Sequence, residues 1–175
     1  MTTWEKCVEF HGHSCGGLRI GYRAAQYAME LLNVGFSDNE QVVCISENDA
    51  CGVDAIQVML GCSVGKGNLL FHMTGKQAFS FYNRATGQSV RLLLKPKPAG
   101  MTPEESARYY FDHDARELFT VMPTRLPLPT PAKFLTAMTA NVAGRRPGPI
   151  GSASWAVRSC ASTAAAGTTA LTYKR

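Results

Sequence analysis

The sequence predicts a mixed α+β fold, in which a largely antiparallel sheet with flanking helices precedes a poorly ordered or atypical C-terminal tail. Two observations predict it: some segments carry apolar residues at helical spacing, and others are short β-rich runs separated by glycine turns. With 175 residues, 45% of them hydrophobic and 18% charged, the chain suits one globular domain and a small appendage.

The first half of the chain predicts two helices and a strand between them. Apolar residues at helical spacing from Leu18 to Leu32 predict a helix that begins after Gly17 and stops before Gly35. The run 42–45 reads as a buried strand, and 53–60 reads as a second, short helix.

Three β-rich segments follow, at 69–73, 78–82 and 90–95, and at least two of them are expected to pair in antiparallel fashion. Thr102 and the Pro-Glu-Glu after it form a capping box that starts another helix. The aromatic residues of that helix are expected to form core or dimer contacts. They are Tyr109, Tyr110 and Phe111, with Leu118 and Phe119 beyond.

The chain divides into a core domain at 1–124, a proline-rich linker at 125–131 and a degenerate or disordered tail at 132–175. The net charge of +5 belongs to the tail, because residues 1–130 hold 12 basic and 13 acidic residues, whereas 131–175 hold six basic and none acidic. A folded basic face that could bind nucleic acid is therefore not expected.

The chain has no basic and apolar leader and no apolar run of about 18 residues, so we expect a cytoplasmic protein without a membrane partner. Its six cysteines are then expected to be thiols or metal ligands rather than a disulfide framework. Cys7 and Cys44 lie in apolar surroundings and are expected to be small buried side chains.

Three segments bring imidazole or thiol groups to a helix end or a tight turn. Nitrogen and sulfur ligands of this kind suit a divalent transition metal, with zinc first and nickel or iron as alternatives. No in-frame CxxC pair occurs, so the fold would have to assemble the site. The candidate ligands are His11, His13, Cys15, Cys51 and Cys62.

Other roles stay open for some of these residues. Cys15 starts a helix close to His13, which also suits a reactive, catalytic thiol. His11 could orient the other ligands instead of binding metal. Asp54 and Gln57 lie on one helix face and could hydrogen-bond a bound ligand.

The glycine-rich segment 61–67 departs from a nucleotide-binding P-loop in its spacing and in having Gly67 after Lys66. Lys66 suits either an anionic group at the site or a plain tight turn.

Three motifs in this order and spacing resemble the family of the E subunit of formylmethanofuran dehydrogenase: FHGHSCGGL at 10–18, CGVDAIQ at 51–57 and GCSVGKGN at 61–68. The resemblance covers roughly residues 5–130 and departs at Gly16, where the family usually has proline. It implies an α+β core, usually dimeric, with a metal-binding cleft built from the His/Cys segments. The family name comes from a protein that copurifies with a molybdenum or tungsten enzyme.

Many members of that family carry a small C-terminal zinc module with two CxxC pairs, which is not recognisable here. The tail has one cysteine and no histidine, so it cannot form a four-ligand zinc site alone. A one-base frameshift offers an explanation, because alanine codons can then become cysteine codons in zinc-ribbon spacing. The positions are Ala140, Ala143, Ala161 and Ala164. Codons for Thr139 and Val142 that do not end in T or C would exclude it.

Three hypotheses for function follow. The first is a metal-binding protein with an open coordination position, serving a larger molybdenum or tungsten oxidoreductase. The second is a noncatalytic dimeric scaffold whose metal is structural. The third is a thiol or redox enzyme that uses Cys15 as nucleophile. No residue identifies a substrate.

Overall fold

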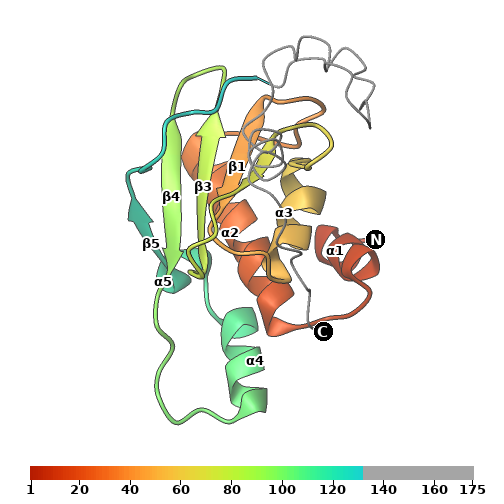
Figure 1. Cartoon of the computed structure of the whole chain (residues 1–175). Helices are drawn as coiled ribbons and strands as arrows, with labels where there is room; N and C mark the ends of the chain where they lie inside the picture. The colour runs from red at the N-terminus through yellow and green to blue at the C-terminus, as the bar shows by residue number, and fades with distance from the viewer. Residues whose placement is uncertain (132–175) are drawn as a thin grey trace, which may run out of the picture. The chain divides into compact units, whose positions relative to one another are not determined.

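The computed structural model describes residues 1–131, which form one compact unit, and it confirms the predicted α+β fold. Five strands form a sheet in the order β2-β1-β3-β4-β5 (Figure 1). β1 and β2 run parallel, and the remaining neighbours are antiparallel. The strands are β1 (Val42–Ser46), β2 (Leu69–Phe71), β3 (Ala78–Asn83), β4 (Ser89–Leu94) and β5 (Phe119–Met122).

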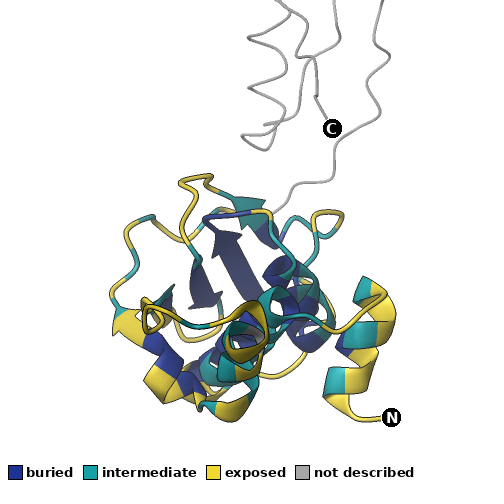
Figure 2. Cartoon of the chain, turned by 90° about the horizontal axis from the view of Figure 1, so that it is seen from below, coloured by how far each residue is buried: buried dark blue, intermediate teal, exposed yellow. Residues whose placement is uncertain are grey.

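Helices α2 (Gly16–Leu32) and α3 (Gly52–Leu60) contribute to one core with alternate residues of the strands. Phe79 and Phe81 of β3 and Leu92 of β4 face this core and are fully buried. Figure 2 shows the central strands β1 and β3 in dark blue, and helices that mix buried and exposed residues. Cys7 and Cys44 are also fully buried, as predicted.

The predicted helices and strands of the first half appear within a few residues of their expected limits. The first predicted helix ends at Leu32, because Asn33 adopts the left-handed conformation with a φ of 47° and caps it. α3 links the parallel strands β1 and β2, as such a crossover requires. This connection places the start of α3 directly after the carboxyl end of β1.

Three elements were not predicted: α1 (Thr3–His11), α5 (Ala115–Leu118) and β5. α1 begins with a capping box between Thr2 and Glu5 and buries Cys7 against the core. A signal for this helix exists in the sequence, because Trp4, Cys7 and Val8 recur at helical spacing and pack on the core, but the element spans only nine residues.

The predicted capping box of the later helix is present, and α4 spans Pro103–Asp112. Tyr109 and Tyr110 pack against the core, which supports the core alternative for the aromatic residues. The Phe111 ring lies edge-on to Trp4 at 5.4 Å between centroids, and its face receives the Arg19 guanidinium. The later aromatic residue, Phe119, begins β5 and is buried.

The opposite face of the sheet holds a smaller cluster of Val43, Ile45 and Tyr82. The proline-rich segment 125–131 is tied to β3 and the turn after it. Tyr82 Oη donates to the Leu126 carbonyl at 2.7 Å, and Arg84 Nη1 donates to the Pro129 carbonyl at 2.6 Å.

The tail at 132–175, with its proposed frameshift, lies outside the described residues. Within residues 1–131, no helix combines the length and the apolar character needed to cross a membrane.

Candidate metal centre

The turn between α1 and α2 positions the first candidate ligands. Gly12 ends α1 in the left-handed conformation, with a φ of 89°, so the chain reverses directly after His11. Cys15 is the N-cap of α2, and its sulfur accepts a hydrogen bond from the Leu18 N–H at 3.3 Å. A backbone amide at a helix start stabilises negative charge, so this cap suits a thiolate ligand.

His11, His13 and Cys15 meet in this turn. One ligand atom from each lies within 4.8 Å of the other two. His11 Nε2 lies 3.8 Å from Cys15 Sγ, and the two imidazole rings lie 4.6 Å apart between centroids. The fold therefore assembles two nitrogen donors and one sulfur donor at one point.

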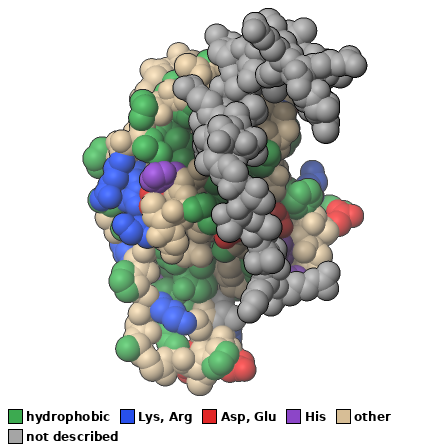
Figure 3. Space-filling model, viewed as in Figure 1, with side chains coloured by type: hydrophobic (Ala, Val, Ile, Leu, Met, Phe, Trp, Pro, Cys, Tyr) green, Lys and Arg blue, Asp and Glu red, His purple; other side chains and the backbone are tan. Residues whose placement is uncertain are grey.

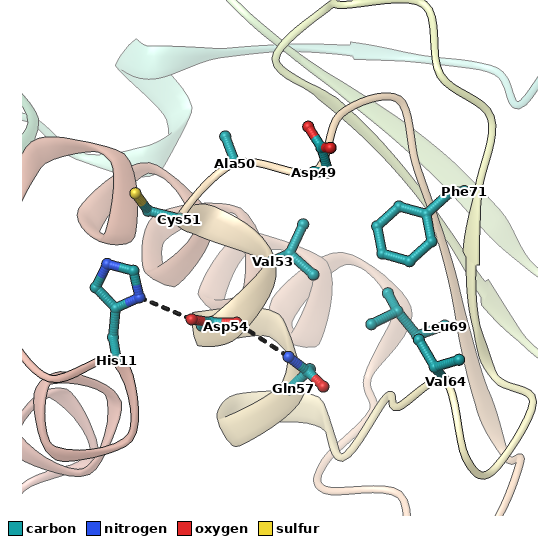
Figure 4. Close-up of a pocket in the computed structure, with 10 residues that line it drawn as sticks. All are labelled: His11, Asp49, Ala50, Cys51, Val53, Asp54, Gln57, Val64, Leu69 and Phe71. Atoms are coloured by element: carbon teal, nitrogen blue, oxygen red, sulfur yellow. Dashed lines mark hydrogen bonds and ion pairs between the residues drawn. The ribbon is translucent and has the colours of Figure 1, made fainter. Parts of the chain in front are cut away.

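Asp54 fixes the orientation of the His11 ring from the neighbouring helix. Its Oδ2 lies 2.7 Å from His11 Nδ1, and Gln57 Nε2 donates to its Oδ1 at 3.1 Å (Figure 4). A proton on Nδ1 that is donated to Asp54 leaves Nε2 with a lone pair toward Cys15. Asp54 and Gln57 thus act through His11, an arrangement common behind metal-bound imidazoles.

Close packing of α2 on α3 brings Cys51 beside Cys15. A Cβ atom built on Gly17 would lie 3.5 Å from Cys51 Sγ and 3.9 Å from Cys15 Sγ, so both sulfurs border one small space. Cys51 occupies the N-cap position of α3, but its side chain makes no capping hydrogen bond. The thiol is therefore available for the contact with Cys15. Burial raises the pKa of Cys51, and the hydrogen bond that its thiol donates to Cys15 raises it further, because this bond stabilises the protonated form.

The structure places Cys62 away from this turn. Its side chain is fully buried and donates to the Val42 carbonyl at 3.6 Å, and burial raises its pKa to about 12. Burial raises the pKa of the neighbouring Cys44 thiol too. Cys62 thus joins the core under β1 and does not meet His11, His13 and Cys15.

Lys66 also points elsewhere. Its Nζ donates to the Ser37 carbonyl at 2.6 Å and lies 5.4 Å from the centre of the Phe36 ring. Both contacts hold the glycine-rich segment to the loop before β1, so the tight-turn alternative describes this lysine.

A cleft of about 480 Å³ opens beside the candidate ligands. His11, Cys51, Asp54 and Gln57 form its polar side. Its other side comes from α3, β2 and the flanking loops, and Figure 4 shows Phe71 across the cleft from His11. The remaining lining residues are Asp49, Ala50, Val53, Val64 and Leu69.

Two residues that shape this site, Gly21 and Phe71, were not predicted, and Asp49 and Gly52 were noted only as part of the segment around Cys51. For Gly21 a signal exists, because a glycine within an apolar helix stripe often marks a close helix contact. For Phe71 the sequence predicts only a position in a β-strand. It does not show that this strand end packs beside α3 and lines the cleft.

These features define a small α+β protein with a candidate His/Cys metal site where α1, α2 and α3 meet. The chain belongs to the FmdE family, described as "FmdE, Molybdenum formylmethanofuran dehydrogenase operon", whose pattern matches residues 10–120. The resemblance found in the sequence is thereby confirmed.

The chain is also similar to a curated protein and to a solved structure. A "Probable S-adenosyl-L-methionine-binding protein" from Archaeoglobus fulgidus is 33% identical over 118 residues, which are 65% of this chain and 30% of that protein. The chain thus spans less than a third of this relative. The crystal structure of a tungsten formylmethanofuran dehydrogenase FmdE-like protein from Syntrophus aciditrophicus shares the fold, with a TM-score of 0.55, 23% identity and 83% of each chain covered.

Proposed function

We propose that this protein binds a divalent transition metal through His11, His13 and Cys15. The observation that carries the proposal is the convergence of their ligand atoms within 4.8 Å of one another, with His11 held by Asp54. Histidines that bind metal almost always donate their second ring N–H to a carboxylate, carbonyl or water in this way. Gln57 in turn donates a hydrogen bond to Asp54 and so holds the Asp54 carboxylate in position.

The donor set fits zinc first, with nickel or iron as alternatives. Two imidazoles and a thiolate are borderline to soft ligands. In a tetrahedral zinc site the ligand atoms lie about 3.5 Å apart, close to the 3.8 Å between His11 Nε2 and Cys15 Sγ. Cys51 stands next to Cys15, and we propose it as the fourth ligand.

A metal with an open position supplies a Lewis acid and a bound water of lowered pKa. The protein's own residues prepare the site for it. Asp54 holds the Nδ1 proton of His11, and the Leu18 N–H supports the sulfur of Cys15. The cleft beside His11 and Cys51 leaves room for a small molecule near such a position.

As for its cellular role, we propose that the protein is a cytoplasmic, homodimeric accessory of a larger molybdenum or tungsten oxidoreductase. The family description, which refers to the operon of such an enzyme, supports this role. Co-purification with a tagged copy of this chain, followed by size measurement of the complex, tests the accessory role and the dimer together.

A second candidate function is thiol chemistry at Cys15. The sulfur accepts a backbone amide and lies near His11 Nε2, as in cysteine nucleophiles paired with histidine. Alkylation of Cys15 in metal-free and metal-loaded protein separates the two functions. Metal ligation predicts that bound metal protects Cys15, whereas a free nucleophile reacts equally in both samples.

Elemental metal content of purified protein is the direct test of the metal site. We expect about one transition-metal ion per chain in wild type, and its loss in Cys15→Ser. Cys62→Ser is the matched control, because it removes a thiol that lies away from the turn and should retain the metal. Wild type that is metal-free and cannot be reconstituted contradicts the proposal, as does a Cys15→Ser protein with full metal content.

A further inference from the structure

The cleft beside the candidate metal ligands has two chemically different ends. His11 and Cys51 lie at one end and Phe71 lies at the other, whereas Asp49 stands on the loop above the middle of the cleft (Figure 4). The volume of about 480 Å³ is in the range of small-molecule sites. The side chains at the end away from His11 therefore help to determine which class of molecule the cleft binds.

Apolar side chains give this end a surface for a flat or aliphatic group. Phe71 of the short strand β2 supplies most of this surface, because its neighbours Val53 and Leu69 are buried, with 7% and 2% of their surface exposed. Phe71 is partly buried against the main core, so its ring is held in place rather than free in solvent. A fixed aromatic ring contacts apolar groups well and attracts cations to its face.

The charges at the cleft are negative. Both oxygens of Asp54 are engaged, one with His11 and one with Gln57. The Asp49 carboxylate, in contrast, has no hydrogen-bond or ion-pair partner among residues 1–131. No lysine or arginine of this part of the chain lines the cleft. On the face shown in Figure 3, Lys and Arg side chains gather instead along the side of the sheet that carries β4 and β5.

We infer that the cleft binds a small organic cation, with its apolar body against Phe71 and its charged nitrogen beside Asp49. A ligand whose only charge is a carboxylate or phosphate would meet the Asp49 carboxylate without a neighbouring cationic side chain. The inference concerns residues that are not proposed metal ligands, so it stands in the metal-free protein as well. It adds a ligand class to the proposed metal site.

Three probes with the same phenyl ring, similar size and different charge test this ligand class: benzylamine, benzyl alcohol and benzoate. Each is titrated into metal-free protein at low salt, and the dissociation constant is taken from amide shifts in NMR spectra. We expect benzylamine to bind about two- to fivefold more tightly than benzyl alcohol, and benzoate to bind most weakly. The shifts should centre on the residues around Asp49 and Phe71.

Two substitutions assign the preference to its residues. Asp49→Asn should bring benzylamine to the affinity of benzyl alcohol, whereas Asp49→Glu should keep the preference. Phe71→Leu should weaken both probes. Asp38→Asn removes a like charge from an exposed loop that does not line the cleft, and should change nothing.

Benzoate that binds as tightly as benzylamine overturns the inference, and so does a preference that survives in Asp49→Asn. Shifts centred elsewhere, or no binding of any probe at millimolar concentration, also overturn it. These readouts do not involve metal, so they are separate from the metal-content test. A protein that holds metal but shows no charge preference would contradict only the ligand class. A protein that shows the preference but holds no metal would contradict only the metal site.

Discussion

Gly21 of α2 and Gly52 of α3 touch backbone to backbone: a Cβ atom built on Gly21 would lie 1.9 Å from the Gly52 carbonyl oxygen. No side chain other than hydrogen fits at this crossing. The contact determines how closely the two helix starts approach, and Cys15 and Cys51 stand at those starts. The contact between Gly21, six residues after Cys15, and Gly52, directly after Cys51, thus controls the spacing of the candidate site.

Gly21→Ala should therefore destabilise the fold and disturb the site. Overpacking of this kind lowers the free energy of unfolding by about 1–3 kcal/mol. Here the new methyl group would clash with backbone atoms of Gly52, which cannot change rotamer as a side chain can. Denaturant unfolding measures the loss, and metal content should fall in parallel. Gly35→Ala is the control, since a Cβ there meets no atom within 4 Å, and it should leave stability within about 1 kcal/mol of wild type.

Asp54→Asn should weaken metal binding without unfolding the protein. The carboxylate lies 2.7 Å from His11 Nδ1, and partners of this kind typically contribute about 10–100-fold to metal affinity. Competition with a chromophoric chelator measures the change. Asp38→Asn, on a loop outside the site, should bind metal like wild type. An unchanged affinity in Asp54→Asn would remove Asp54 from the site.

Cys62 should be unreactive in the folded protein. Burial raises its pKa to about 12, so the thiol stays protonated near neutral pH, and it is shielded from solvent. Iodoacetamide should label the partly exposed Cys15 first in metal-free protein, as read by peptide mass mapping. In guanidinium the two should label at similar rates. Labelling of Cys62 at the rate of Cys15 under native conditions would contradict its placement.

The buried pair of Glu47 and Arg91 should make stability depend on acid pH. Arg91 Nε donates to Glu47 Oε1 at 2.6 Å, and Arg91 is 1% exposed. The hydrogen bond from Arg91 lowers the pKa of Glu47 below its usual 4.5. Because the folded state holds the carboxylate, this contribution is complete above pH 4.5 and is lost as the pH falls through the lowered pKa.

Glu47→Gln should accordingly cost on the order of 3 kcal/mol near neutral pH, since it leaves a buried guanidinium without its counter-charge. Unfolding curves at neutral pH and at a pH below the lowered pKa of Glu47 provide the measurement. The difference between wild type and variant should shrink at the lower pH. A constant difference at both values would show that the ion pair is not the source.

Local patterns in the sequence were sufficient for much of the fold. The apolar stripe from Leu18 to Leu32 and the apolar run at 42–45 produce the predicted helix and strand, because a helix or strand of this kind must bury that face. The Thr102 capping box begins a helix as expected. α1 was not predicted, although Trp4, Cys7 and Val8 recur at helical spacing, because a helix of nine residues offers few such positions.

The amino-acid sequence alone established which groups were available for chemistry: the His/Cys turn at 11–15, Cys51 before a helix, and Asp54 with Gln57 on one helix face. Tertiary packing then selected which of them meet. Cys62 turns into the core and Lys66 binds the Ser37 carbonyl, although both occur in a matching motif. The reason is physical: spacing along the chain sets local direction, whereas the approach of α2 to α3 through Gly21 and Gly52 sets distance across the fold.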